Sequence, residues 1–82
     1  MKYFVYVIKS KTYRNRYIGS TDNVLRRLGE HNGGKCRYTN GRVPWEFVYQ
    51  ENFDTRAEAM KREKFLKSGQ GRKWLDEKLK YL

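Results

Sequence analysis

Two stretches near the N-terminus predict paired β-strands. Residues 3–8 are β-branched or aromatic throughout, so both alternating faces of a strand would be apolar. After a polar stretch, residues 16–19 are interpreted as a second short strand, most simply joined to the first as a hairpin. Because a strand that is apolar on both faces belongs inside a sheet, we expect residues 3–8 to form the central strand.

The middle of the chain predicts a short helix, a loop and a third strand. Residues 20–22 offer N-cap side chains, and apolar residues recur at helical spacing up to about His31. Residues 32–42 contain three glycines and two asparagines without an apolar period, which predicts a mobile surface loop. Pro44 can begin a strand, and the alternation after it predicts one aromatic face. The apolar helix positions are Val24, Leu25 and Leu28, and the aromatic strand positions are Trp45, Phe47 and Tyr49.

Two further helices are predicted in the last third of the chain. Thr55 and Glu58 form a capping box, and the helix that they open is expected to run to Ser68 with Gly69 at the C′ position. A shorter closing helix is expected after residues 70–71, with an apolar side formed by Trp74, Leu75, Leu79 and Leu82. The order of elements is therefore ββαβαα, an α+β arrangement, and we expect one domain over residues 1–82.

The composition excludes several classes of protein. The 82-residue chain has one cysteine, which rules out an internal disulfide and a cysteine-rich zinc site. No apolar run approaches the roughly 18 residues of a membrane span. These features favour a cytoplasmic protein that uses no membrane. Cys36 has no adjacent histidine to form a thiolate, so it is interpreted as an incidental thiol.

The net charge of +10 is concentrated in one half of the sequence. Residues 9–42 carry nine basic and two acidic side chains, whereas the chain from residue 43 onward carries nine basic and seven acidic ones. Tyrosines among these charges suit a nucleic acid, because phosphates attract the charge while rings stack on bases. The alternative is a solvated basic face that serves solubility. The predicted nucleic-acid contacts are Lys9, Arg14, Arg16, Arg26, Lys35, Arg37, Tyr38 and Arg42.

One carboxylate is predicted on an apolar helix stripe. The stripe consists of Ala59, Met60, Glu63, Leu66 and Lys67 at helical spacing, with Glu63 in its middle. A carboxylate on such a face needs a cation, a metal or a hydrogen-bond donor. A metal ligand and a structural salt bridge are both consistent with this position.

The roles of four other candidate residues are equally open. Arg27 and His31 are spaced i, i+4 on the first helix, so they emerge on one side and can meet one phosphate, although solvated charge is the usual occupant of a helix flank. Strand tyrosines such as Tyr6 and Tyr17 are most often core rings with a hydrated hydroxyl. None of these residues alone selects a reaction.

The ordered set of these residues resembles the GIY-YIG nuclease superfamily. The set comprises Phe4-Val5-Tyr6, Tyr17-Ile18-Gly19, Thr21, Leu25, Arg27-Leu28, His31, and Glu63 within Arg62-Glu63-Lys64. The likeness covers nearly the whole chain and is strongest for the small, single-domain bacterial branch similar to the nuclease module of the excision-repair endonuclease. In that branch the loop and third strand also look like Arg37-Tyr38-Thr39 followed by Pro44-Trp45.

The resemblance implies a three-stranded antiparallel sheet flanked by helices and an endonuclease that hydrolyses DNA phosphodiester bonds with one divalent metal, Mg²⁺ or Mn²⁺. By position it implies that Tyr6 and Tyr17 are the motif tyrosines, Arg27 the helix arginine, His31 the residue one turn later, and Glu63 the metal ligand. Branched or damaged DNA is the expected substrate, as in DNA repair. Larger members append DNA-binding domains, so a protein partner is a candidate for targeting this one.

Hydrolysis also requires a base, and a free tyrosine with a pKa of about 10 is a poor one at neutral pH. A neighbouring cation would have to stabilise the phenolate. We interpret Tyr17, beside Arg27, as the base and Tyr6 as the residue that positions the water. His31 is either a hydrogen-bond relay or the competing base.

Two functions without catalysis remain as alternatives. A nucleic-acid-binding module could keep the nuclease fold and charge without turnover. The absence of the Asn that many members carry after the Glu63 position favours this alternative. An adaptor that binds a protein or a ribosome would need only the basic face.

Overall fold

The central strand of the sheet is β1 (Tyr3–Ser10), as its two apolar faces predict. The computed structural model describes residues 2–13 and 15–80. Strand β1 pairs antiparallel with β2 (Arg16–Thr21) on one side and with β3 (Trp45–Phe53) on the other. The predicted order ββαβαα and the antiparallel α+β class are confirmed.

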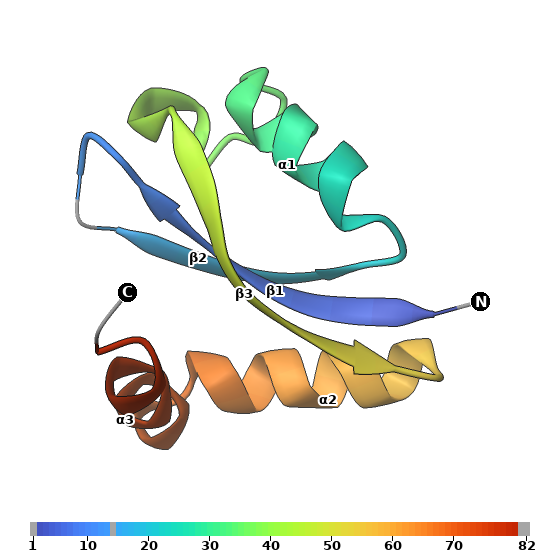
Figure 1. The fold of residues 1–82 in the computed structure, drawn as a ribbon. Coiled ribbons are helices and arrows are strands. Elements are labelled where there is room, and N and C mark those ends of the chain that lie inside the picture. The colour runs from blue at the N-terminus through green and yellow to red at the C-terminus, as the bar shows by residue number, and fades with distance from the viewer. Residues whose placement is uncertain (1, 14, 81–82) are drawn as a thin grey trace.

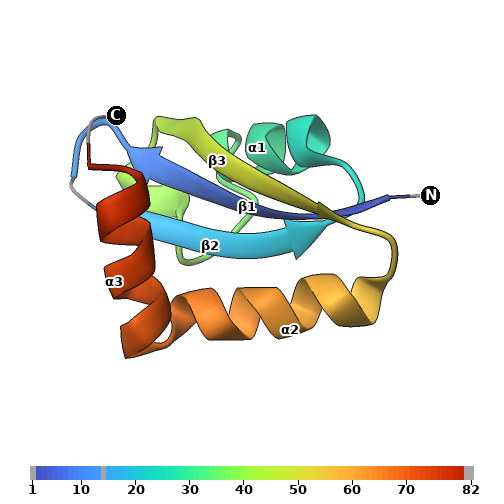
Figure 2. The same cartoon turned by 60° about the horizontal axis from the view of Figure 1, so that its bottom comes forward.

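Helices cover both faces of this sheet. Helix α1 (Val24–Asn32) lies on one face, and α2 (Arg56–Lys67) and α3 (Gly69–Lys78) lie on the other (Figure 1). Figure 2 shows α3 turning sharply away from the end of α2. No helix in residues 2–13 and 15–80 is long and apolar enough to cross a membrane.

The alternation along β1 builds one core on each face of the sheet. Val5 and Val7 pack with buried residues of β2, α2 and α3, whereas Tyr6 and Ile8 pack with Trp45 on the α1 side. The core on the α2 and α3 side also contains Ile18, Ala59, Leu66 and Leu75. The Tyr6 ring, with its hydroxyl group, is thereby placed in the core between the sheet and α1, which we call the α1 core.

The third strand does not have the single aromatic face that its alternation predicts. The β1–β3 register shifts between Val7 and Ile8, so that Tyr49 pairs with Val7 and Phe47 with Ile8. The extra residue in β3 reverses the sides of the positions beyond it. Trp45 therefore packs in the α1 core, whereas Tyr49 packs in the other core and Phe47 is exposed.

Two helix starts follow local side-chain chemistry, one of them at an unpredicted residue. Thr55 begins α2 as expected, because its Oγ1 accepts a hydrogen bond from the Glu58 backbone N–H at 3.1 Å. Helix α1 is capped by Asn23, whose Oδ1 accepts from the Arg26 N–H at 3.0 Å, and not by residues 20–22. Thr21 is engaged earlier, since its Oγ1 accepts from the Asn23 N–H.

The junction between α2 and α3 also differs from the prediction. Ser68 ends α2 and caps α3, because its Oγ accepts from the Gly71 N–H at 3.2 Å. Gly69 is therefore the first residue of α3 and not a C′ residue. At Gly71 a Cβ would collide with the carbonyl oxygen of Phe65, so this close corner requires glycine. The predicted helix position Leu82 lies outside the described residues.

The core-facing side of α2 is narrower than the predicted stripe. Ala59 and Leu66 are fully buried, but Met60 and Lys67 are exposed. The side of α2 that contains Ala59 and Leu66 faces the sheet. The residue that follows each of them in the sequence lies on the solvent-exposed side of the helix. Leu25 is likewise exposed on α1, where Val24, Leu28 and His31 form the inner side.

The loop predicted as mobile is anchored at two points. Thr39 is buried, and its carbonyl oxygen accepts from Trp45 Nε1 at 3.0 Å just before the short 3-10 helix η1 (Asn40–Arg42). At the end of α1, the Asn32 side chain accepts from the Trp45 N–H and donates to the Trp45 carbonyl oxygen. These contacts tie the loop and the start of β3 to the α1 side of the sheet.

Candidate active site

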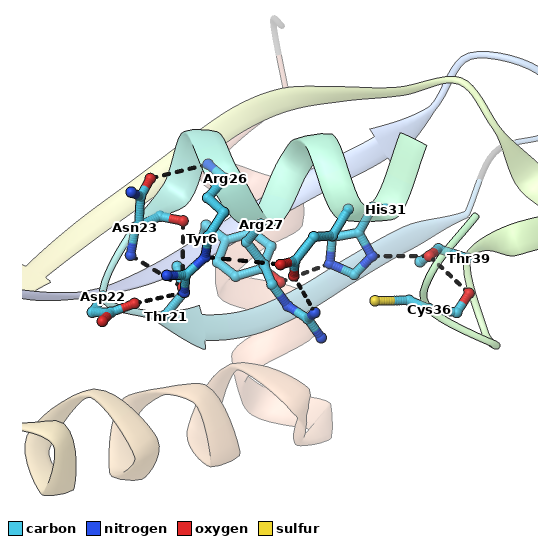
Figure 3. A network of polar contacts seen from close by, with 10 residues as sticks. Tyr6, Thr21, Asp22, Asn23, Arg26, Arg27, His31, Cys36 and Thr39 are labelled. Atoms are coloured by element: carbon cyan, nitrogen blue, oxygen red, sulfur yellow. Dashed lines mark hydrogen bonds and ion pairs between the residues drawn. The ribbon is translucent and has the colours of Figure 1, made fainter. Parts of the chain in front are cut away.

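A buried chain of hydrogen bonds joins β1, α1 and the anchored loop. The Tyr6 hydroxyl lies 2.8 Å from His31 Nε2, and His31 Nδ1 lies 2.9 Å from Thr39 Oγ1 (Figure 3). All three side chains are fully buried. His31 is therefore part of the core, although its spacing from Arg27 also suited an exposed helix flank.

The hydrogen bond from Thr39 to Cys36, together with the neutral state of His31, determines which atoms donate and which accept in the other two hydrogen bonds. The Thr39 hydroxyl donates to the Cys36 carbonyl oxygen at 3.3 Å, which uses its only proton. Thr39 then accepts from His31 Nδ1–H. Because burial lowers the pKa of His31, the imidazole is neutral, and its unprotonated Nε2 accepts from the Tyr6 hydroxyl.

Burial keeps both partners of the Tyr6–His31 bond uncharged. The pKa of Tyr6 is raised well above its usual value, first by burial and then by Tyr17, while the nearby Arg27 charge partly opposes the shift. The pKa of His31 is lowered by burial and by the same Arg27 charge. A neutral pair of this kind avoids the cost of a buried charge.

Aromatic rings surround His31. The Tyr17 ring centroid lies 4.7 Å from that of His31 and 6.3 Å from that of Tyr6. Tyr38 continues this cluster toward the surface, with its ring centroid 5.8 Å from that of Tyr17. The two motif tyrosines and His31 are therefore brought together as the sequence resemblance implies.

Gly19 and Thr39 complete this cluster, and residue-type reasoning gave neither a role. Gly19 pairs with Tyr6 in the β1–β2 ladder, and a Cβ at this position would lie 2.6 Å from the Tyr6 hydroxyl oxygen. In the sequence, Gly19 was identified only as the last residue of the motif Tyr17-Ile18-Gly19. Thr39 was identified only as the last residue of Arg37-Tyr38-Thr39. Their contribution depends on contacts that a linear pattern does not contain.

The two adjacent arginines of α1 have different surroundings. Arg27 Nη1 donates to Glu30 Oε1 at 2.8 Å, and its side chain is 33% exposed. This bond raises the Arg27 pKa, outweighing burial, so the guanidinium is charged. Arg26 donates to Asp22 Oδ1 at 2.8 Å and is 55% exposed. Only Arg27 is placed to act on the Tyr6 hydroxyl electrostatically.

Glu63 lies on α2, across the sheet from α1. Its side chain is 22% exposed, and Oε2 accepts from Lys67 Nζ at 2.6 Å. Within residues 2–13 and 15–80 no group of three or more His, Cys, Asp or Glu side chains is arranged to hold a metal. Oε1 has no partner among those residues, which fits a Mg²⁺ or Mn²⁺ ion that is held by one carboxylate and keeps most of its waters.

An open cavity of about 520 Å³ lies beside Tyr17. Residues of β2, the Tyr38 loop, the end of α2 and the first turn of α3 form its walls. They are Asn15, Arg16, Tyr17, Ile18, Tyr38, Lys67 and Arg72, and we call this cavity the β2 groove. Lys67 and Arg72 come from the half of the sequence whose charge is nearly balanced, so the charge count did not single them out.

The predicted nucleic-acid contacts have different surroundings, and among the described ones Arg16 and Tyr38 line the β2 groove. Arg16 is engaged by Asp76 of α3 at 2.6 Å. Arg42 lies over the Tyr38 ring, with its Cζ 4.9 Å from the ring centroid. Lys9, Lys35 and Arg37 are exposed, and Arg14 lies outside the described residues.

Comparison with known proteins identifies the family. Residues 2–76 match the GIY-YIG catalytic domain. A UPF0213 protein of Staphylococcus haemolyticus is 44% identical over 68 residues, which cover 82% of this chain and 82% of that protein. A UPF0213 protein of Natronomonas pharaonis is 45% identical over 67 residues, 80% of this chain and 78% of that protein.

A solved structure agrees with these matches. The solution NMR structure of a UPF0213 protein from Bacillus halodurans is similar with a TM-score of 0.55 and 35% sequence identity, covering 92% of this chain and 82% of that one. The matched range 2–76 includes β1, β2 and β3 and both motif tyrosines. The chain therefore belongs to the GIY-YIG catalytic-domain family, a family of nucleases.

Proposed function

We propose that this protein is a metal-dependent endonuclease that hydrolyses phosphodiester bonds of DNA, with branched or damaged DNA as its substrate. The observation that carries the proposal is that Tyr17, which lines the basic β2 groove, lies against His31 and Tyr6, with the Arg27 charge next to the Tyr6 hydroxyl. Such a cluster combines proton acceptors, a fixed cation and a surface for phosphates.

Tyr17 is the proposed general base. It lines the β2 groove, whereas the Tyr6 hydroxyl is buried and bonded to His31. In the proposed step the Tyr17 oxygen, as phenolate, takes a proton from water as the water oxygen bonds to phosphorus. The bond from phosphorus to the leaving oxygen then breaks, and that oxygen takes a proton from solvent.

Tyr6 and His31 are proposed to act mainly through Tyr17. The His31 ring packs against Tyr17, and Tyr6 and Thr39 fix the orientation and tautomer of that ring. They are therefore positioning residues in this arrangement, because neither touches the groove. The interpretation from the sequence that Tyr6 positions the attacking water stays a prediction.

Arg27 is proposed to stabilise the negative charge that grows on the phosphate oxygens. A guanidinium offers forked donors, and Arg27 stays charged because Glu30 supports its positive charge. Glu30 also holds the side chain in place before substrate arrives. A preorganised donor of this kind acts more strongly on the transition state than on the bound substrate.

Glu63 is the proposed metal ligand. Its free Oε1 and partial exposure suit a hard divalent cation that binds through a single carboxylate. When bound, such a cation would polarise the scissile phosphate and stabilise the leaving oxygen. Lys67 would have to share or release the carboxylate, so it controls the availability of the ligand.

The test is a nicking assay on supercoiled plasmid with Mg²⁺, Mn²⁺ or EDTA, using wild type, Tyr17→Phe and Glu63→Gln. We expect nicking by the wild-type protein with either metal, no nicking in EDTA, and loss in both variants. A wild-type protein that binds the plasmid but does not nick it under any condition, including on branched DNA, would instead support the nucleic-acid-binding module.

A further inference from the structure

The β2 groove has two chemically different sides. Tyr17 and Tyr38 present aromatic rings, whereas Lys67 and Arg72 bring cations from the far side of the sheet. Its volume of about 520 Å³ is within the range of sites that hold one small ligand, about 300–1,000 Å³. None of the described residues that line it is acidic.

The cations of the groove differ in their availability. Arg16 is engaged by Asp76, and Lys67 is engaged by Glu63. Arg72 has no carboxylate partner among residues 2–13 and 15–80, and its side chain is exposed. Among the described residues that line the groove, Arg72 is therefore the cation for which no acidic side chain competes with an incoming phosphate.

The aromatic side offers a stacking surface. The Tyr38 ring is 50% exposed, and the Arg42 guanidinium stacks on it while Nη1 donates to the Tyr38 carbonyl oxygen at 2.8 Å. Arg42 does not line the groove, so it holds the ring from outside. Aromatic rings that are fixed in this way are typical platforms for nucleic-acid bases.

A base can use such a platform only if it is free of its own neighbours. In a duplex both faces of a base are covered by adjacent bases, whereas an unpaired base can turn toward a protein ring. The groove is also too small for a duplex, which is wider than any single-ligand cavity. The combination of Tyr38 and Arg72 therefore fits one unstacked nucleotide.

We propose that the β2 groove binds one unpaired DNA nucleotide, with its base on Tyr38 and its phosphate on Arg72. This inference rests on the proposed function, because it concerns the substrate that enters the same cleft. It gives the protein a preference for DNA with a single-stranded segment over continuous duplex. It also gives α3 a direct part in substrate binding.

The experiment measures binding without turnover. Fluorescence anisotropy in EDTA follows a fluorescein-labelled oligo-dT and a duplex of the same length over a range of salt concentrations. The variants are Tyr38→Ala and Arg72→Ala. The matched controls are Tyr13→Ala, an exposed tyrosine outside the groove, and Lys73→Ala, the exposed cation next to Arg72.

We expect Tyr38→Ala to weaken oligo-dT binding by about 5- to 100-fold and duplex binding much less, since one base loses its stacking partner. Arg72→Ala should weaken binding and reduce the slope of log K against log salt by about 0.7 on the single strand, the value for one lost phosphate contact. Tyr38→Phe, which keeps the ring, should bind like wild type. Thermal unfolding verifies that each variant is folded.

Several results would overturn the inference. Equal losses for Arg72→Ala and Lys73→Ala would mean that α3 supplies only diffuse charge, and equal losses for Tyr38→Ala and Tyr13→Ala would remove the stacking site. If the protein nicks DNA but both groove variants bind DNA like wild type, the proposed nucleotide site is wrong and the proposed catalysis stands. Loss of binding in the variants of a protein without nicking activity supports the groove and removes the proposed catalysis.

Discussion

Gly19 lies opposite Tyr6 in the β1–β2 ladder, and the Tyr6 hydroxyl occupies the space that a side chain at Gly19 would fill. The same hydroxyl bonds to His31, so the position of one glycine determines whether the buried Tyr6–His31–Thr39 chain can form. Tyr6 of the first motif can therefore pack in its observed position only because residue 19, in the second motif, is a glycine.

Gly19→Ala should displace Tyr6 and break its bond to His31. Because the displaced ring is in a packed core, we expect a loss of about 1–3 kcal/mol in the free energy of unfolding. Urea denaturation measures this loss. Gly29→Ala is the control, since a Cβ there meets nothing within 4 Å and alanine favours a helix by up to about 1 kcal/mol. Equal stability of Gly19→Ala and wild type would contradict this interpretation of the ladder.

His31 should make the protein less stable as the pH falls. The pKa of His31 in the folded protein lies below the ordinary value of 6.5, so the unfolded chain takes up a proton that the folded chain does not. The free energy of unfolding should therefore decrease as the pH falls through the ordinary value of 6.5, by at most about 1.4 kcal/mol per pH unit.

The sequence contains one histidine, so its NMR signals give the pKa and the tautomer without ambiguity. We expect the proton on Nδ1 and a titration midpoint below 6.5. His31→Gln should remove this part of the pH dependence. A midpoint at or above 6.5 would show that the imidazole is not held neutral.

Arg27→Ala and Arg26→Ala should separate a placed charge from a general one. In single-turnover cleavage, losing the Arg27 guanidinium should reduce the rate by about 10²- to 10³-fold, the scale for one preorganised donor. Arg26→Ala should have a small effect, because Arg26 faces Asp22 and solvent. Arg27→Lys should recover little, since an ammonium lacks the planar fork. Equal losses at both positions would remove Arg27 from the proposed mechanism.

Glu63→Gln should abolish Mn²⁺ binding with little change in DNA affinity. The Glu63–Lys67 ion pair is partly exposed and spaced i, i+4, so its loss should cost only about 0.3–0.5 kcal/mol of stability. Calorimetric titration with Mn²⁺ measures the site, and Glu77→Gln, an exposed acid on α3, is the control. Equal Mn²⁺ affinity in wild type and Glu63→Gln would leave Glu63 with its ion pair alone.

Gly71→Ala should loosen the corner between α2 and α3. A Cβ at this position collides with backbone atoms of Phe65 and Leu66, which cannot move as a flexible side chain can. We expect a loss of about 1–3 kcal/mol, measured as a lower urea midpoint. Gly69→Ala, two residues earlier and with open space around its Cβ, should be neutral or slightly stabilising.

The sequence predicted those elements whose signals are local. The two apolar faces of residues 3–8 gave the centre of the sheet correctly, and the Thr55 cap gave the start of α2. The bulge in β3 could not be predicted, because it depends on the pairing with β1 and not on the alternation of Trp45, Phe47 and Tyr49. Gly69 was a plausible C′ residue, but Ser68 caps the next helix immediately.

The candidate site shows the same division. Motif spacing predicted that Tyr6, Tyr17 and His31 belong together, and the structure brings them together. Periodicity did not predict the burial of His31 or Thr39, because that burial depends on hydrogen bonds between β1, α1 and a glycine-rich loop. The place of Arg72 in the β2 groove could not be predicted for a similar reason. It depends on the turn at Ser68, which brings the start of α3 to the groove.

The bulge in β3 also makes this edge strand less able to pair with strands of other protein molecules. Strand β3 is at the edge of the sheet in the described part of the chain, and an edge strand of nine residues is a template for pairing with other chains. A bulge in the pairing with β1 bends and twists β3, which makes its outer edge a poorer match for a second flat strand. Glu46 and Gln50 are exposed along the same strand, which makes it a poorer site for aggregation.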